Sequence, residues 1–106
     1  MFGRQVTLKL KTNSATELNR IAEAEILPIL RKQKGFRDET TFVAPERSEA
    51  IVNSFWDTKA DADAYSRTAY TEVLKTLSSV IDGTPTVKNF EFARSTFQPV
   101  ATSKLV

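Results

Sequence analysis

Apolar and polar side chains alternate along the first part of the chain. Between residues 4 and 11, Val6, Leu8 and Leu10 share one parity, and polar side chains occupy the other. Alternation with a period of two is typical of a β-strand that buries one face. The pattern therefore predicts a first strand over residues 4–11, with the three aliphatic side chains turned toward a core.

The apolar spacing then becomes helical. Ser14 and Glu17 have the spacing of a capping box, in which each side chain bonds the backbone N–H near the other. Apolar residues recur at helical spacing as far as a basic stretch that precedes Gly35, a residue suited to ending a helix. Pro28 lies inside this helix, where it removes a donor and crowds the preceding turn, so we expect a kink or break near residues 24–27.

Two β-rich segments follow, over residues 36–43 and 49–57. The residues between them, 44–48, are mostly polar and include a proline, which is typical of a turn. The three segments together predict an antiparallel hairpin.

A second helix and a last strand complete the pattern. Thr58 and Asp61 again have capping geometry, and apolar residues at helical spacing predict one long helix over residues 60–81. Asp82 and Gly83 would close this helix. Pro85 would then open a final strand over residues 86–97, where side chains alternate again.

The chain length and these elements predict one domain over residues 1–97, followed by a tail over residues 98–106. The tail has no clear period. It is either disordered or packs on a partner subunit.

The order βαββαβ predicts an α+β, ferredoxin-like domain with a four-stranded antiparallel sheet and two helices on one face. Such a sheet leaves its other face open, and here both parities of the hairpin strands are apolar. One parity carries Ile51, Phe55 and Val43, and the other carries Val52, Trp56 and Phe42. Large open apolar faces usually mark an interface, so we expect a homodimer in which two sheets pack face to face.

Composition narrows the possible chemistry. The chain contains no histidine and no cysteine, so zinc hydrolysis, histidine-ligated haem, Ser-His-Asp catalysis and cysteine nucleophiles lose their key residues. No spacing of carboxylates indicates a metal site, and we expect no metal or other cofactor. The net charge of +2 is mild, so we expect no nucleic-acid partner.

The N-terminal residues lack the apolar segment and cleavage site of a signal peptide. No apolar run is long enough to cross a bilayer, so we expect no membrane partner and a cytoplasmic location.

Three segments resemble the antibiotic biosynthesis monooxygenase family, which belongs to the dimeric α+β barrel superfamily. They are Gly35-Phe36-Arg37 after the proline-containing helix, Ser54-Phe55-Trp56-Asp57-Thr58, and residues 60–65. The resemblance extends over residues 3–97. It implies a homodimeric barrel with a pocket between sheet and helices, lined by aromatic and polar side chains.

The resemblance also implies two kinds of activity. Cofactor-free members oxidise small phenol-like or anthrone-like aromatic substrates with dioxygen. Haem-degrading members use a histidine on the second helix, which this chain lacks, so the first activity is our leading hypothesis. The alternative is a non-catalytic dimeric barrel that binds a small hydrophobic ligand or has a structural role.

Five side chains are candidates for such a pocket. Trp56, Asn53 and Tyr65 are the catalytic candidates, because an indole N–H and an amide can hydrogen-bond and orient a substrate oxygen. A phenol can act as a hydrogen-bond donor or, if its pKa is lowered, as a proton acceptor. Tyr70 and Arg94 are candidates for substrate binding. Each has a simpler interpretation as well: Trp56 as a core residue, Asn53 as a polar residue of an edge or interface, the tyrosines as packing residues, and Arg94 as an ion-pair or solvated residue.

Overall fold

The computed structural model describes residues 1–94, and within them it confirms the α+β, ferredoxin-like architecture. A four-stranded antiparallel sheet has the order β2-β3-β1-β4. Its strands are β1 (Phe2–Leu10), β2 (Phe36–Ala44), β3 (Glu49–Trp56) and β4 (Ile81–Glu91). Residues 95–97 of the predicted domain and the predicted tail, 98–106, lie outside the described residues.

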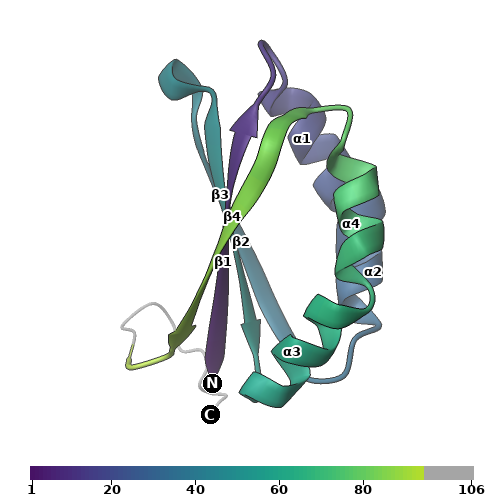
Figure 1. The fold of residues 1–106 in the computed structure, drawn as a ribbon, viewed down its shortest axis with the longest axis vertical. Coiled ribbons are helices and arrows are strands. Elements are labelled where there is room, and N and C mark those ends of the chain that lie inside the picture. The colour runs from purple at the N-terminus through teal and green to yellow at the C-terminus, as the bar shows by residue number, and fades with distance from the viewer. Residues whose placement is uncertain (95–106) are drawn as a thin grey trace.

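The helical segments pack along one face of this sheet, and the described residues place no helix on the other face (Figure 1). They are α1 (Ala15–Ile21), the π-helix η1 (Ala22–Ile26), α2 (Leu27–Arg31), α3 (Lys59–Arg67) and α4 (Tyr70–Leu77). A short 3₁₀ turn, η2 (Pro45–Arg47), joins β2 to β3. None of the helices in residues 1–94 combines the length and apolar character needed to cross a membrane.

The expected irregularity in the first helix is a π-helical turn. The N–H of Leu27 donates to the carbonyl of Ala22, five residues earlier, instead of four. Pro28 follows directly, where it lacks the N–H that would continue the α-helical pattern. The break predicted from Pro28 is therefore confirmed, and η1 is its form.

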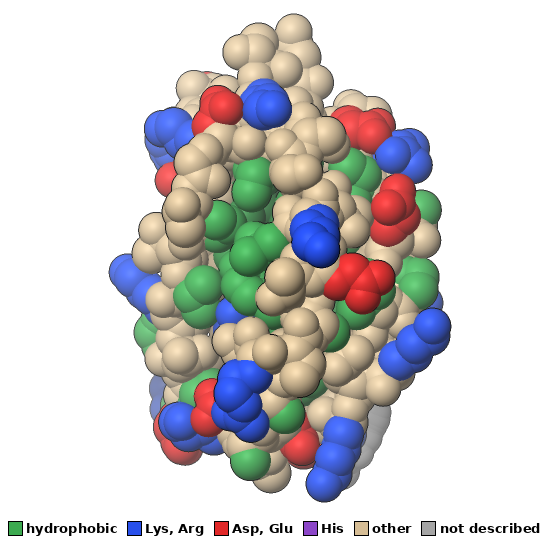
Figure 2. Space-filling view, turned by 45° about the vertical axis from the view of Figure 1, so that its right-hand side comes forward, with side chains coloured by type: hydrophobic (Ala, Val, Ile, Leu, Met, Phe, Trp, Pro, Cys, Tyr) green, Lys and Arg blue, Asp and Glu red, His purple; other side chains and the backbone are tan. Residues whose placement is uncertain are grey.

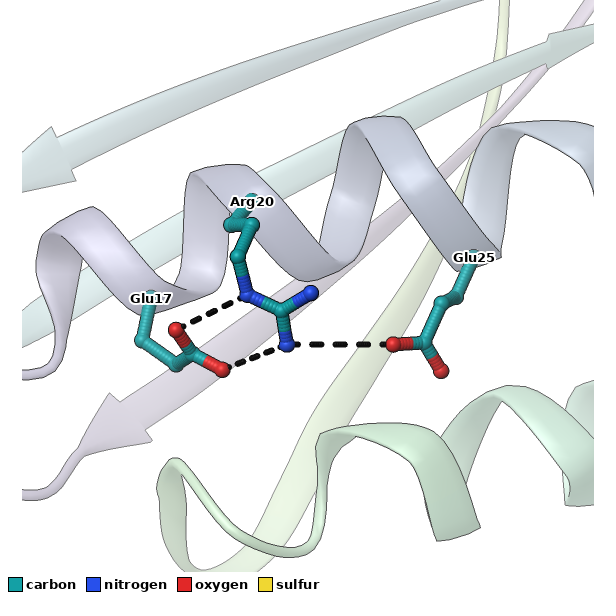
Figure 3. Close-up of polar contacts among 3 residues, drawn as sticks. All are labelled: Glu17, Arg20 and Glu25. Carbon is teal, nitrogen blue, oxygen red and sulfur yellow. Dashed lines mark hydrogen bonds and ion pairs between the residues drawn. The ribbon is translucent and has the colours of Figure 1, made fainter.

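The capping box predicted at the start of this helix does not form. Ser14 precedes α1 but makes no side-chain capping bond. Glu17 instead accepts hydrogen bonds from Arg20, at 3.0 Å to Nε and 2.6 Å to Nη2. Arg20 also reaches Glu25 at 3.8 Å, because the π turn brings residues five apart onto one side (Figure 3). The hydrogen bond from Arg20 lowers the pKa of Glu17.

The second helix is capped as predicted but is not continuous. The Thr58 hydroxyl accepts a hydrogen bond from the Asp61 N–H at 3.1 Å. The helix then breaks at Thr68, whose φ of −120° and ψ of −87° are not helical. Its N–H donates to the Tyr65 carbonyl, three residues earlier instead of four. The prediction of one helix over residues 60–81 is wrong for this reason.

The last strand begins earlier than predicted, at Ile81. Thr7 pairs with Thr86 and Lys9 pairs with Asp82, so β4 bulges between these two pairs. An edge strand tolerates proline and glycine at such a bulge, and Gly83 has the positive φ of 70° that the bulge needs. The predicted helix end at Gly83 and strand start after Pro85 are therefore corrected to one strand, Ile81–Glu91.

Both faces of the sheet carry apolar groups as expected, but two residues lie on the face opposite to the one predicted. Phe42 pairs with Ile51, and Val43 pairs with Ala50. Paired residues point to the same side, so Phe42 is on the open face and Val43 packs against the core. Parity within one strand does not carry over to the next, because the hairpin register joins odd-numbered to even-numbered positions.

Candidate functional site

A small apolar cavity lies between the sheet and the helices. Its volume is about 40 Å³, and its wall combines aliphatic side chains from β1, α1, α2 and α4 with a few polar groups. The polar groups are Arg4, Glu39, Thr41, Ser54, Tyr65 and Tyr70. In Figure 2, hydrophobic side chains gather in a hollow near the centre of one face, with charged side chains around it. A cavity of about 40 Å³ holds a few water molecules, so a larger ligand requires the wall to move.

Arg4 brings a positive charge to this cavity from the buried face of β1. It shares the parity of Val6 and Leu8 and is only 4% exposed. Its guanidinium carbon lies 4.1 Å from the centre of the Tyr70 ring and 5.5 Å from that of Tyr65. Its Nη2 group donates to the Ser66 hydroxyl at 3.4 Å. The sequence analysis missed Arg4, although its parity with the apolar residues of β1 was the signal.

The two tyrosines meet because the second helix is broken. On a straight α-helix, residues five apart are rotated by about 140° from one another. The break between α3 and α4 instead brings the rings of Tyr65 and Tyr70 to 5.9 Å, and both line the cavity. These two candidates are therefore brought together.

Burial raises the pKa of Tyr65 well above its ordinary value of 10.0, although the nearby Arg4 cation partly opposes this effect. Tyr65 is therefore a neutral phenol at physiological pH. In this form its hydroxyl is a hydrogen-bond donor rather than a proton acceptor.

Trp56 lies behind Tyr65 and does not line the cavity. Its side chain is fully buried, and its ring stacks on that of Tyr65 at 5.0 Å. Its indole N–H donates to the Ser54 hydroxyl at 2.9 Å, so this donor is already used within the protein. Any influence of Trp56 on a ligand in the cavity would act through the position of Tyr65.

Asn53 lies on the opposite, open face of the sheet. Its amide oxygen accepts a hydrogen bond from Gln5 Nε2 at 3.2 Å. It lines a second cavity of about 140 Å³ beside Phe55, Phe90 and Phe92. The structure thus separates Asn53 from the tyrosines by the thickness of the sheet.

Arg94 is the last described residue, and its side chain is exposed. It lines neither cavity. The structure therefore brings together Tyr65 and Tyr70 of the predicted set, with Trp56 in contact behind them, and places Asn53 and Arg94 elsewhere. Within residues 1–94, no cluster of Asp and Glu side chains is arranged to hold a metal ion.

No family model and no curated protein sequence matches this chain. Solved structures do share its fold. The chain matches a monooxygenase from the gene ActVA-Orf6 of Streptomyces coelicolor, solved with the ligand nanaomycin D, with a TM-score of 0.73 and 17% identity over 92% of this chain and 91% of that one. It also matches a protein of Bordetella bronchiseptica, provisionally named an antibiotic biosynthesis monooxygenase, with a TM-score of 0.73 and 11% identity over 88% and 97% of the two chains.

A further match is a protein of unknown function, NE2512 of Nitrosomonas europaea, with a TM-score of 0.72 and 16% identity over 92% and 94% of the two chains. At these identities the matches establish the architecture and not the reaction. The chain has the fold of the antibiotic biosynthesis monooxygenases.

Proposed function

We propose that this protein is a cofactor-free monooxygenase that acts on a small phenol-like or anthrone-like aromatic compound. The observation that carries this proposal is the apolar cavity between sheet and helices, where Tyr65 and Tyr70 converge. Small-molecule sites are typically apolar with a few placed polar groups. The solved monooxygenase of the same fold forms a complex with the ligand nanaomycin D.

The proposed reaction needs dioxygen but no external reductant. An anthrone loses a proton to give its anion, and this anion reduces dioxygen. The CH₂ group becomes a carbonyl, one atom of dioxygen enters the product, and the other leaves as water. A phenol becomes a quinone with the same balance.

Tyr65 has a defined role in this proposal. Its raised pKa keeps its hydroxyl protonated, so it can donate a hydrogen bond to the oxygen of the substrate anion. The mostly aliphatic wall around it lowers the local dielectric constant and so strengthens this bond.

The proposal also includes a homodimer. The open face of the sheet presents Phe42, Phe90 and Phe92, which are 58%, 50% and 38% exposed. A second copy packed on this face would bury these rings together with the cavity beside Asn53.

Aerobic turnover of a panel of phenols and anthrones tests the proposal, with oxygen uptake and quinone absorbance measured together. Product should form in air and not under argon. Tyr65→Phe, which keeps the ring and removes the hydroxyl, should lower the rate, whereas Ser79→Ala, which removes an exposed hydroxyl, should not. Absence of turnover across the panel would contradict the monooxygenase proposal.

The second candidate function is a non-catalytic binder of a small hydrophobic ligand. Binding needs only the apolar cavity and its few polar groups, without any reaction with dioxygen. Binding of an aromatic compound without oxygen uptake would support it.

A further inference from the structure

We infer that the ligand of the cavity between sheet and helices carries one negative charge, as a phenolate or carboxylate, and that Arg4 binds it. The inference rests on the proposed ligand-binding function and specifies the charge of the ligand. It requires no catalysis.

The first argument is the unmet hydrogen-bonding capacity of Arg4. A guanidinium group has several N–H donors, and a buried arginine is normally paired with a carboxylate or with several acceptors. Arg4 is 4% exposed, yet among residues 1–94 its side chain makes one long hydrogen bond, to Ser66 at 3.4 Å, and no ion pair. Arg4 lines the cavity wall, and no other hydrogen bond of its guanidinium is formed with residues 1–94.

The second argument is the arrangement of the rings. Tyr70 and Tyr65 contact the guanidinium with their faces, which stabilises the cation without using its N–H donors. These donors lie in the plane of the group and stay free for a planar oxyanion, which arginine binds in a bidentate manner.

The other charged group of the cavity wall is Glu39. Its carboxylate accepts a hydrogen bond from the neighbouring Thr41 hydroxyl on β2 and makes no ion pair with Arg4. The titratable groups around a bound anion are therefore Arg4, Glu39, Tyr65 and Tyr70. Glu39 opposes the anion electrostatically, which gives a second way to test the inference.

4-Nitrophenol is a suitable probe, because its phenolate is yellow and its neutral form is not. If Arg4 binds the anion, the bound probe should ionise at a pH about one unit or more below that of the free probe, which corresponds to about tenfold tighter binding of the phenolate. Benzoate should displace it, and benzamide, which has the same shape without the charge, should displace it at least about tenfold less well. Displacement of the probe by benzoate would show that the cavity binds a carboxylate as well as a phenolate.

Variants assign the effect to Arg4. Arg4→Met should abolish the shift in probe ionisation, and Glu39→Gln should enlarge it. Arg37→Met removes an exposed arginine that pairs with Asp57 on the surface and should leave it unchanged. If Arg4→Met does not fold, Arg4→Lys and the comparison of benzoate with benzamide on the unaltered protein still decide the question.

Equal binding of neutral and anionic probes, no binding of either probe, or a preference for the anion that survives in Arg4→Met would overturn the inference. These outcomes are distinct from failure of the proposed reaction. Turnover of a phenol without preference for anions would support the monooxygenase proposal and contradict the role of Arg4. Binding of benzoate through Arg4 without turnover of any substrate would support the role of Arg4 and contradict the monooxygenase proposal.

Discussion

Arg4 and Tyr70 form a cation–π pair at the wall of the cavity, with the guanidinium carbon 4.1 Å from the ring centre. Arg4 comes from β1 and Tyr70 from the start of α4. The pair therefore joins the sheet to the helix that follows the break between α3 and α4. Because Arg4 is buried, the ring replaces part of the stabilisation that water would give its charge.

Replacing Tyr70 with leucine should therefore destabilise the protein by about 1–2 kcal/mol, because the buried cation loses its main ring contact. The free energy of unfolding in urea measures this loss. In a double-mutant cycle with Arg4→Met, the two changes should be coupled by about 1 kcal/mol. Additive effects would show that the rings only pack beside Arg4.

Ser54 keeps the indole N–H of Trp56 satisfied inside the core. Ser54→Ala should cost about 1–3 kcal/mol of unfolding free energy, because it leaves this donor buried without a partner. Ser79→Ala removes an exposed hydroxyl and should change stability by less than about 0.5 kcal/mol. Trp56 is the one tryptophan of the chain, so its fluorescence reports both unfolding and any change around its ring. Equal stability of the two variants would contradict this role of Ser54.

Glycine is required at position 35 both by the backbone conformation there and by the close approach of Asp61. Its φ is +81°, and a Cβ at this position would lie 2.7 Å from the Cβ of Asp61 and clash with the Asp61 carboxylate. Gly35→Ala should therefore destabilise the protein by more than about 2 kcal/mol, measured as a shift in the urea midpoint.

Gly83→Ala is the matched control, since Gly83 also has a positive φ, of 70°, but a Cβ there would meet no atom within 4 Å. It should cost about 1 kcal/mol, from the backbone alone. Similar losses in the two variants would mean that Asp61 moves aside at little cost.

Tyr65 gives the protein a dependence on alkaline pH. Because its pKa is raised in the folded state, the folded protein holds this proton more tightly than the unfolded chain does. The corresponding stability is complete below the ordinary pKa of 10.0 and is lost as the pH rises from there toward the folded pKa. In a Tyr70→Phe background, tyrosinate absorbance should therefore develop together with unfolding. Ionisation of Tyr65 in the intact fold near its ordinary pKa would contradict this assignment.

The sequence predicts the order of strands and helices well, because period-two alternation, Pro28 and the Thr58 cap each act within a few residues. It predicts the site less well. The meeting of Tyr65 with Tyr70 depends on the break between α3 and α4, and the helical spacing of the apolar residues gives no sign of this break. The face of the sheet on which a β2 residue lies also depends on the register of the hairpin. This register places Phe42 on the open face and Val43 against the core, the opposite of the prediction.

Arg4 was predictable in principle. It continues the alternation of Val6, Leu8 and Leu10, and a charged residue on a buried parity is a reason to look for a function there. The sequence does not show which side chains surround this charge, since Ser66, Tyr65 and Tyr70 lie more than sixty residues from Arg4 along the chain.

The open face of the sheet leads to the last prediction, on assembly. We expect the protein to be a dimer at micromolar concentration, because the exposed rings of Phe42 and Phe90 lie on this face with Phe55 and Phe92. Phe42→Glu with Phe90→Glu should shift the protein to a monomer in sedimentation velocity, since buried, unpaired charges would oppose the interface.

Val87→Glu provides a control on the same edge strand. Val87 is 38% exposed but pairs with Val6, so it points toward the helices rather than the open face. This variant should remain a dimer, because its charge lies outside the proposed interface and reaches solvent. A monomeric unaltered protein would contradict the dimer itself, and loss of the dimer in Val87→Glu alone would place the interface on the edge or helix side of β4 instead.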